Sequence, residues 1–300
     1  MRAVLLLLSA ALAAAAPAAP AAKPGYGILL LAHGGDADWN AQVETLRARV
    51  DAKVPTEAAL GMADPKTLQA ALDALAARGV ARAVAVPLFV HSRSEVLDQM
   101  RYTLGLSDKP SEVLRSAAAA MAAMHAPMHH FMFSLERVKT RLPVVLTPAL
   151  DDDVFVSRIL LERARALSRE PKSETVVLVA HGPVDDAAVG AWNKTLARHA
   201  DFVRREGGFR AASFAVLRDD AAPPVRAASV AALRATVAAG AKAGRALVVP
   251  VLIARGGIEG KLPHDLQGLE YAWDAETLMP HDGFAAWVLK RAAQAPRAAP

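Results

Sequence analysis

The sequence contains the same segment twice, and this repeat limits the folds that the chain can adopt. Residues 27–35 read Gly-Ile-Leu-Leu-Leu-Ala-His-Gly-Gly, and residues 175–183 read Thr-Val-Val-Leu-Val-Ala-His-Gly-Pro. Each copy is an unbroken apolar run, which is typical of a β-strand buried on both faces of a sheet. Each run ends in Ala-His-Gly and is followed by a Trp-Asn pair. Self-similarity of this kind indicates two related folding units.

A second apolar segment follows at the corresponding place in each half. Residues 81–91 end in Pro-Leu-Phe-Val-His, and residues 244–254 end in Pro-Val-Leu-Ile-Ala. An Ala-rich helical stretch precedes each of them, at residues 67–78 and 227–239. Strands that alternate with helices of this length predict parallel sheets with helices on both faces.

These patterns predict an α/β fold of two similar parallel-sheet lobes with a cleft between them. We expect an N-terminal lobe at residues 23–168 and a C-terminal lobe at residues 175–300. The polar segment Ser-Arg-Glu-Pro-Lys-Ser-Glu at residues 168–174 interrupts the pattern between them. Because the duplication already pairs two lobes within one chain, we expect a monomer.

Residues 1–22 are expected to lie outside this fold. Arg2 precedes a short apolar core, and the stretch ends in Ala and Pro residues that suit a signal peptidase. This order is typical of a secretory signal peptide and predicts a periplasmic or secreted protein. The alternative is an uncleaved anchor helix, although the apolar run is short for a membrane span. We expect no membrane span in the rest of the chain.

The composition narrows the possible chemistry. The chain has no cysteine, which excludes disulfides and thiolate metal sites. A bound metal would therefore use His, Met or carboxylate groups. The net charge of +5 is spread along the chain and suits an acidic small ligand. It forms no basic block of the kind that binds nucleic acid.

Two histidines of the first half lie at the ends of predicted strands. His33 follows the first apolar run, and His91 ends the second. Ligands of parallel α/β sheets bind beyond the carboxyl ends of the strands, so both side chains should point into one cleft. Neutral imidazole binds divalent metals and accepts protons, which makes this pair the candidate metal and catalytic site. Gly34 and Gly35 allow close approach of an anionic ligand but lack the spacing of a nucleotide-binding loop.

The second half retains only one of these histidines. His181 corresponds to His33, whereas Ala254 stands at the position of His91. We interpret His181 as a structural residue or as a remnant of the duplication. Arg255, next to Ala254, is a candidate to bind a substrate carboxylate, since a guanidinium group suits that partner.

Residues 121–132 have no counterpart in the second half and are rich in Met and His. One interpretation is a lid that gathers metal through His125, His129 and His130. Thioether with imidazole would suit copper(I), and imidazole alone also suits nickel, cobalt and zinc. The other interpretation is core packing, because Met commonly fills irregular gaps. Pro127 argues against one unbroken helix here.

Three consecutive acidic residues, Asp151 to Asp153, precede a predicted helix at residues 154–167. We expect them to cap that helix, because acidic groups favour a helix N-terminus. The alternative is a carboxylate cluster. His199 lies within a helical run and is expected to be structural.

The ordered motifs resemble a known family. Leu-Ala-His33-Gly, Pro-Leu-Phe-Val-His91 and Leu146-Thr-Pro-Ala-Leu-Asp occur in the order found in class II tetrapyrrole chelatases, the sirohydrochlorin cobalto- and ferrochelatase family. The resemblance covers nearly all of the chain after residue 22, since long members carry the same duplication. It implies a lyase that inserts divalent cobalt, iron or nickel into a sirohydrochlorin-type tetrapyrrole without a permanently bound cofactor. His33 and His91 would be the metal ligands and proton acceptors.

The residues supply a chemistry that fits this resemblance. Metal insertion must hold a dication and remove two pyrrole protons, and neutral imidazoles can do both. The carboxylates of the macrocycle would suit Arg93, Arg255 or Lys261. The alternative function is a non-catalytic periplasmic protein that binds metal or tetrapyrrole in the same cleft.

One position departs from the family pattern. Members usually have an acidic residue in the run that reads Leu-Gly-Met-Ala-Asp-Pro at residues 60–65 here. Gly61 stands at that position, and Arg218 is expected there in the second half. Asp64 and Glu57 are the candidate substitutes, although Asp64 directly precedes a proline and suits the start of a helix.

Overall fold

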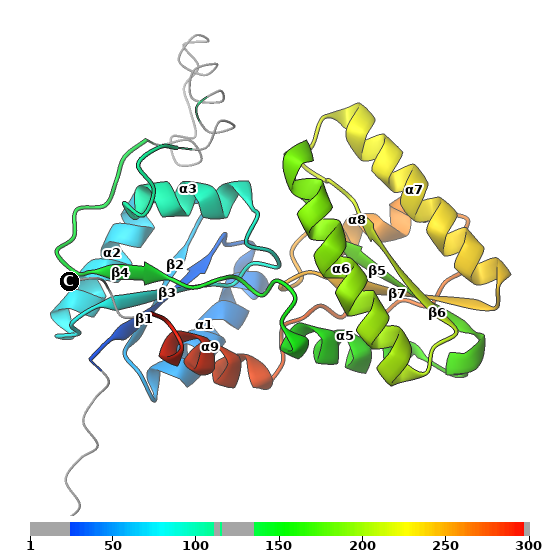
Figure 1. The fold of residues 1–300 in the computed structure, drawn as a ribbon, viewed down its shortest axis with the longest axis horizontal. Coiled ribbons are helices and arrows are strands. Elements are labelled where there is room, and N and C mark those ends of the chain that lie inside the picture. Colours follow the sequence, from blue (N-terminus) through cyan, green and yellow to red (C-terminus); the bar gives the residue numbers. More distant parts are fainter. Residues whose placement is uncertain (1–24, 111–114, 116–134, 297–300) are drawn as a thin grey trace, which may run out of the picture.

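The computed structural model describes residues 25–110, 115 and 135–296, which form two lobes, each built on a parallel sheet (Figure 1). The first sheet has the strand order β2-β1-β3-β4, with β1 at Gly27–Ala32, β2 at Thr56–Leu60, β3 at Ala83–Pro87 and β4 at Val144–Leu146. The second has the order β6-β5-β7, with β5 at Glu174–Ala180, β6 at Ala211–Val216 and β7 at Arg245–Val251. The predicted α/β fold with two parallel sheets is confirmed.

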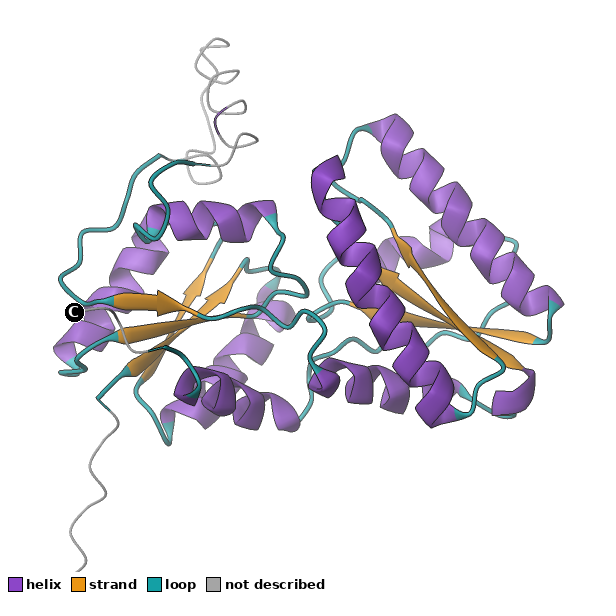
Figure 2. Cartoon of the chain, viewed as in Figure 1, coloured by secondary structure: helices purple, strands orange, loops and turns teal. Residues whose placement is uncertain are grey.

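Helices cover both faces of each sheet (Figure 2). In chain order they are α1 at Ala37–Asp51, α2 at Pro65–Ala77, α3 at Glu95–Thr103, α5 at Val154–Leu167, α6 at Asp186–Gly207, α7 at Pro223–Lys242, α8 at Ile258–Asp265 and α9 at Gly283–Ala293, with a 3-10 turn at Pro171–Ser173. None of the helices in the described part of the chain is both long and apolar enough to cross a membrane.

The two halves repeat the same strand arrangement. β1 and β5 are the central strands, and every residue of both is buried, as the unbroken apolar runs predict. His33 and His181 follow these strands at equivalent points. In the second half, a parallel bridge between Leu247 and Ala272 stands where β4 pairs with β3 in the first half.

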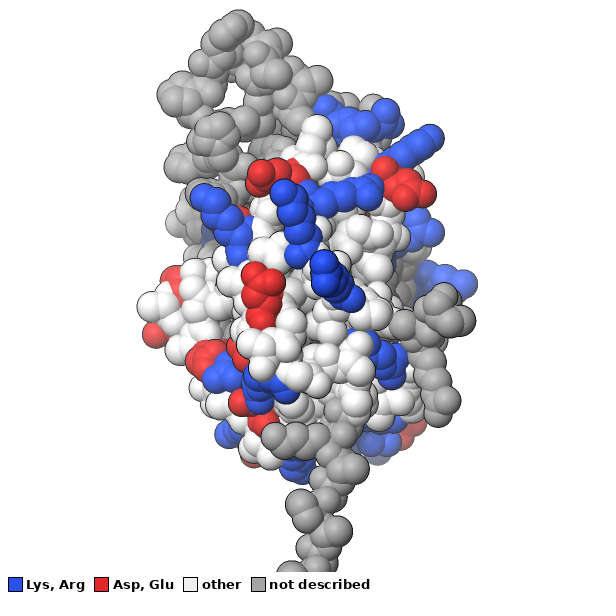
Figure 3. Space-filling view, turned by 90° about the vertical axis from the view of Figure 1, so that its left-hand side faces the viewer, with Lys and Arg blue, Asp and Glu red and all other residues white. Residues whose placement is uncertain are grey.

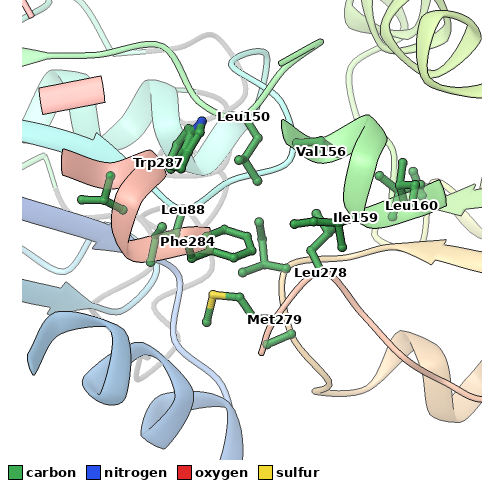
Figure 4. Packing of buried hydrophobic residues seen from close by; sticks show 14 of the residues in the cluster. Leu88, Leu150, Val156, Ile159, Leu160, Leu278, Met279, Phe284 and Trp287 are labelled. Atoms are coloured by element: carbon green, nitrogen blue, oxygen red, sulfur yellow. The ribbon is translucent and has the colours of Figure 1, made fainter. Parts of the chain in front are cut away.

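One helix of each half packs on the other lobe: α5, which follows β4, and α9, which follows the bridge at Ala272. α5 lies against α6 and β7 of the second sheet, whereas α9 lies against α1 and β3 of the first (Figure 1). Val156 and Ile159 of α5 are therefore in the same apolar interior as Phe284 of α9 (Figure 4). One core of buried side chains runs through both lobes.

Asp153 joins these two helices. Its Oδ1 accepts the Phe155 N–H at 2.9 Å and caps α5, which confirms the predicted capping role. Its Oδ2 accepts from Trp287 Nε1 at 3.0 Å and from Arg291 at 2.9 Å, both on α9. Asp153 thus caps α5 and also holds α9 through two hydrogen bonds.

Charged side chains are mixed on the outer end of the N-terminal lobe. Figure 3 views this face and shows Lys and Arg interspersed with Asp, Glu and uncharged surface. This distribution agrees with a net charge that is spread along the chain.

Candidate functional site

A pocket of about 330 Å³ lies where the carboxyl ends of the strands of both lobes meet. The first lobe contributes His33, Trp39 and His91 to its lining. The second lobe contributes further polar groups, among them His181, Trp192, Asp219, Asp220, Glu259 and Lys261. Residues at the ends of β1, β3, β5, β6 and β7 therefore meet in one place, as expected for ligand sites of parallel sheets.

His33 is held in one tautomer at the end of β1. Its Nδ1 lies against the carbonyl oxygen of Gly34, so Nδ1 carries the proton and Nε2 keeps a free lone pair. The ring stacks on Trp39, with centroids 4.9 Å apart. The pocket walls limit hydration of the ring, and this desolvation, with the nearby charge of His181, lowers the pKa of His33. His33 is thus a neutral imidazole that can act as a metal ligand or proton acceptor.

His181 forms an ion pair that the sequence did not reveal. Its Nδ1 lies 2.7 Å from the carbonyl oxygen of Gly182, and its Nε2 lies 3.0 Å from Oδ2 of Asp220. Burial acts to lower the pKa of His181, but the hydrogen bonds to Asp220 and Gly182 outweigh burial, so its pKa is raised. The hydrogen bond from His181 lowers the pKa of Asp220 in turn. The second lobe therefore brings an imidazole and a carboxylate to the pocket.

The neighbouring Asp219 plays a different part. Its side chain is only 4% exposed and forms ion pairs with Lys261 at 2.6 Å and with Arg226 at 2.8 Å. Burial acts to raise the pKa of Asp219, but these two partners lower it below its ordinary value. Lys261, which lines the pocket, is therefore held in an ion pair with a buried carboxylate.

His91 also lines the pocket, but its ring packs against residues of the other lobe. Its Nδ1 accepts the backbone N–H of Arg93 at 2.9 Å, and the backbone of Ala191 on α6 acts to raise its pKa. The indole of Trp192 stacks on it at 5.0 Å. Desolvation by burial lowers the pKa of His91 more than the nearby Asp151 raises it. His91 is thus a neutral histidine whose Nδ1 is occupied and whose ring packs against Trp192 of the other lobe.

The loop that carries His91 is braced by Asp151. Oδ1 of Asp151 accepts the Ser92 N–H at 2.7 Å, and Oδ2 accepts the Ser92 hydroxyl at 2.5 Å. The same carboxylate lies 3.8 Å from Nδ1 of His91. Of the three consecutive aspartates, Asp151 therefore supports the site while Asp153 caps the helix.

The repeated tryptophans each pack against the opposite lobe. Trp192 donates from Nε1 to the carbonyl oxygen of Arg93 at 2.7 Å. Trp39 lies so close to Gly256 that a Cβ added there would be 3.0 Å from Cδ1 of the indole. Arg93 and Gly256 stand at equivalent positions after β3 and β7, so the two contacts are related by the repeat.

Most of the other residues predicted to bind substrate, Gly34, Gly35, Arg93 and Arg255, do not line the pocket. The Gly35 N–H donates to Asn40 Oδ1 at 3.0 Å, so this amide is not available to an anion. Gly34 has φ 77° beside the turn at Gly61 and is not among the residues that line the pocket. Arg93 and Arg255 do not line the pocket either, and Arg255 is paired with Glu276. Lys261 is the member of this set that reaches the pocket wall.

The turn after β2 supplies no carboxylate to the pocket. Asp64 caps α2, and Glu57 pairs with Arg78 at 3.0 Å. Leu60 pairs with Ala32, as Val216 pairs with Ala180, so Gly61 corresponds to Leu217. The expectation that Arg218 is its counterpart is therefore off by one residue.

Four of the features predicted from sequence lie outside the described residues. They are the segment at residues 1–22 and the three histidines His125, His129 and His130. Among the residues that are described, no three His, Asp or Glu side chains converge closely enough to enclose a metal ion as they stand.

Comparison with known proteins agrees with this arrangement. The family model CbiX matches residues 27–167, which hold both His33 and His91. SirB from Bacillus subtilis with Fe3+ superposes with a TM-score of 0.57 at 13% identity, over 90% of this chain and 94% of that chain. The sirohydrochlorin chelatase SirB from Bacillus subtilis subspecies spizizenii in complex with cobalt gives a TM-score of 0.56 at 12% identity, over 90% and 94% of the two chains.

A multi-domain protein from Deinococcus radiodurans with structural similarity to chelatases gives a TM-score of 0.53 at 16% identity. The match covers 91% of this chain and 55% of that one. A search of curated protein sequences finds no match.

The fold of two parallel-sheet lobes therefore resembles that of the chelatase structures. The family match is to the CbiX model, and it lies in the N-terminal half of the chain.

Proposed function

We propose that this protein inserts a divalent metal, cobalt, iron or nickel, into a sirohydrochlorin-type tetrapyrrole. The observation that carries the proposal is the neutral His33 at the carboxyl end of β1. Its Nε2 is free, and the residue lines a pocket that both lobes form. A neutral imidazole can hold a dication and then release it when the ring nitrogens compete for it.

His91 would act with His33 as the second histidine of the N-terminal lobe. In the present conformation its ring is stacked against Trp192 of α6 in the other lobe. A small separation of the lobes at α6 would free the ring to bind metal or accept a proton. Lys261 at the pocket wall would then face the carboxylates of the macrocycle.

The direct test is to mix purified protein with sirohydrochlorin and Co²⁺, or with Fe²⁺ without oxygen, and to follow the absorbance of the macrocycle. An enzyme turns over many macrocycles per protein molecule, and His33→Ala abolishes that turnover. Stoichiometric binding of metal or ring without turnover would instead show the alternative function, a non-catalytic carrier. His264→Ala is the matched control, because that side chain is 87% exposed.

We also propose that the protein is exported, to the periplasm or beyond the cell. The support is the order of charged, apolar and small residues in residues 1–22. The intact mass of the protein recovered from the producing cell tests this proposal. A mass that retains these residues would contradict it.

A further inference from the structure

The two Ala-His-Gly histidines have the same local geometry. Nδ1 of His33 lies against the carbonyl oxygen of Gly34, and Nδ1 of His181 lies against that of Gly182. A histidine that donates one ring N–H to a backbone carbonyl has its other nitrogen oriented as a ligand, and metal-binding histidines are commonly held in this way. Both lobes therefore present an Nε2 atom to the pocket.

In the second lobe, the carboxylate of Asp220 lies next to the imidazole of His181. Oδ2 of Asp220 lies 3.0 Å from Nε2 of His181, so the two groups converge on one point of the pocket. His33 lines the same pocket as these two residues.

We propose that His33, His181 and Asp220 form a divalent-cation site that spans the two lobes. This inference rests on the proposed function in one respect, since the cation would be the metal to be inserted. Two imidazoles and one carboxylate are a ligand set that suits Co²⁺, Fe²⁺, Ni²⁺ and Zn²⁺. The ion bonds to both Nε2 atoms and to the carboxylate, and the proton held between His181 and Asp220 leaves to solvent.

The surrounding charges permit such a site. Lys261 would repel a dication, but it is paired with the buried Asp219, and Arg226, the second cation at Asp219, also pairs with Asp265. Once the proton between His181 and Asp220 leaves, the negative charge of Asp220 faces the cation. The three ligands do not enclose an ion as they stand, so the site completes by rotation of side chains, and the side chain of Asp220 is 65% exposed and can rotate.

A cation held by three protein groups keeps coordination positions for water or for an incoming ligand. Such an open site suits a metal that has to be passed on to a ring. It also assigns a metal-binding role to His181, which from the sequence alone is interpreted as structural or as a remnant of the duplication.

The test uses the full chain and Co²⁺ alone, with binding followed by calorimetry and by the visible absorption of the bound ion. We expect His33→Ala and His181→Ala each to weaken Co²⁺ binding by at least ~10–100-fold, and Asp220→Asn by about 10-fold. The matched controls are His264→Ala and Asp186→Asn, whose side chains are 87% and 88% exposed. Both should bind Co²⁺ as the unaltered chain does.

Failure of the site and failure of the proposed function give different results. Unchanged Co²⁺ binding in His181→Ala and Asp220→Asn, or no binding by the unaltered chain, overturns the site. If His181→Ala does not fold, Asp220→Asn still decides, because it keeps every ring in place. Co²⁺ binding that depends on all three residues, without any metal insertion into sirohydrochlorin, upholds the site and overturns the proposed function.

Discussion

The indole ring of Trp192 in the C-terminal lobe lies nearly parallel to the imidazole of His91 in the N-terminal lobe, with centroids 5.0 Å apart and an interplanar angle of 21°. The environment of a histidine in one half of the chain is therefore set by the other half. Movement of the lobes would change the burial of His91.

Replacement of Trp192 tests this dependence. Trp192→Leu should raise the pKa of His91, because burial is the main cause of its lowered value. It should also destabilise the fold by about 2–3 kcal/mol, as expected for a large-to-small change at a buried tryptophan. NMR titration of the His91 ring proton measures the first effect, and urea denaturation measures the second. Trp39→Leu is the matched control, since Trp39 stacks on His33 instead. An unchanged His91 titration in Trp192→Leu would contradict the prediction.

His199 should make the fold less stable in acid. It is 1% exposed, and its ring nitrogens bond to the Ser157 hydroxyl at 2.7 Å and to the Asp151 carbonyl at 2.9 Å. Burial lowers its pKa below the ordinary value of 6.5. Below that pH the unfolded chain takes up a proton that the folded chain does not, so the free energy of unfolding falls, by up to about 1.4 kcal/mol per pH unit for one proton.

The measurement is the free energy of unfolding from pH 8 to pH 5 for the unaltered chain and for His199→Gln. The variant is less stable at pH 8 but should lose less stability on acidification. His33 and His91 also have lowered pKa values, so both proteins keep some pH dependence. Two parallel curves would show that His199 does not contribute.

Glu174 should stabilise the junction between the lobes. Its side chain is 1% exposed and accepts from the Ser168 hydroxyl at 2.5 Å, from the Arg169 N–H at 2.9 Å and from Arg245 at 3.0 Å. Glu174→Gln removes the charge that these donors stabilise and should cost about 2–3 kcal/mol in urea denaturation. Glu170→Gln, at an exposed residue of the same segment, should cost close to nothing. Equal losses in the two variants would contradict this role.

Restoring an acidic residue at Gly61 should destabilise the protein. Gly61 has φ 136°, a conformation that residues with a side chain rarely adopt. We expect Gly61→Glu to cost at least about 1 kcal/mol, measured by thermal denaturation. Met62→Glu is the control, because Met62 lines the pocket and its backbone has no such constraint. A Gly61→Glu variant as stable as the unaltered chain would be inconsistent with the strain inferred here.

The central strands and the positions of His33 and His181 could be predicted because both depend on local patterns. An unbroken apolar run indicates a strand buried on both faces, and the residue after it lies at the carboxyl end of the sheet. The meeting of His181 with Asp220 follows from the same local pattern. Asp220 comes after β6, the strand beside β5, so both side chains lie at the carboxyl edge of one sheet.

The engagement of His91 could not be predicted in this way. It depends on where α6 of the other lobe lies, and periodicity shows which face of a helix is apolar but not which sheet that face covers. The same limit applies to α5 and α9. Each has an apolar face in the sequence, and only the packed structure shows that each covers the sheet of the other lobe.

The exchange of α5 and α9 bears on how the chain reaches its native state. A fragment that ends near residue 168 would carry α5 without the sheet that α5 covers, and would leave the α9 face of its own sheet in water. We therefore expect that neither half folds on its own, although each contains a complete run of strands. The two should unfold together in a single cooperative transition, and two separately made fragments should each gain stable structure only when they are mixed.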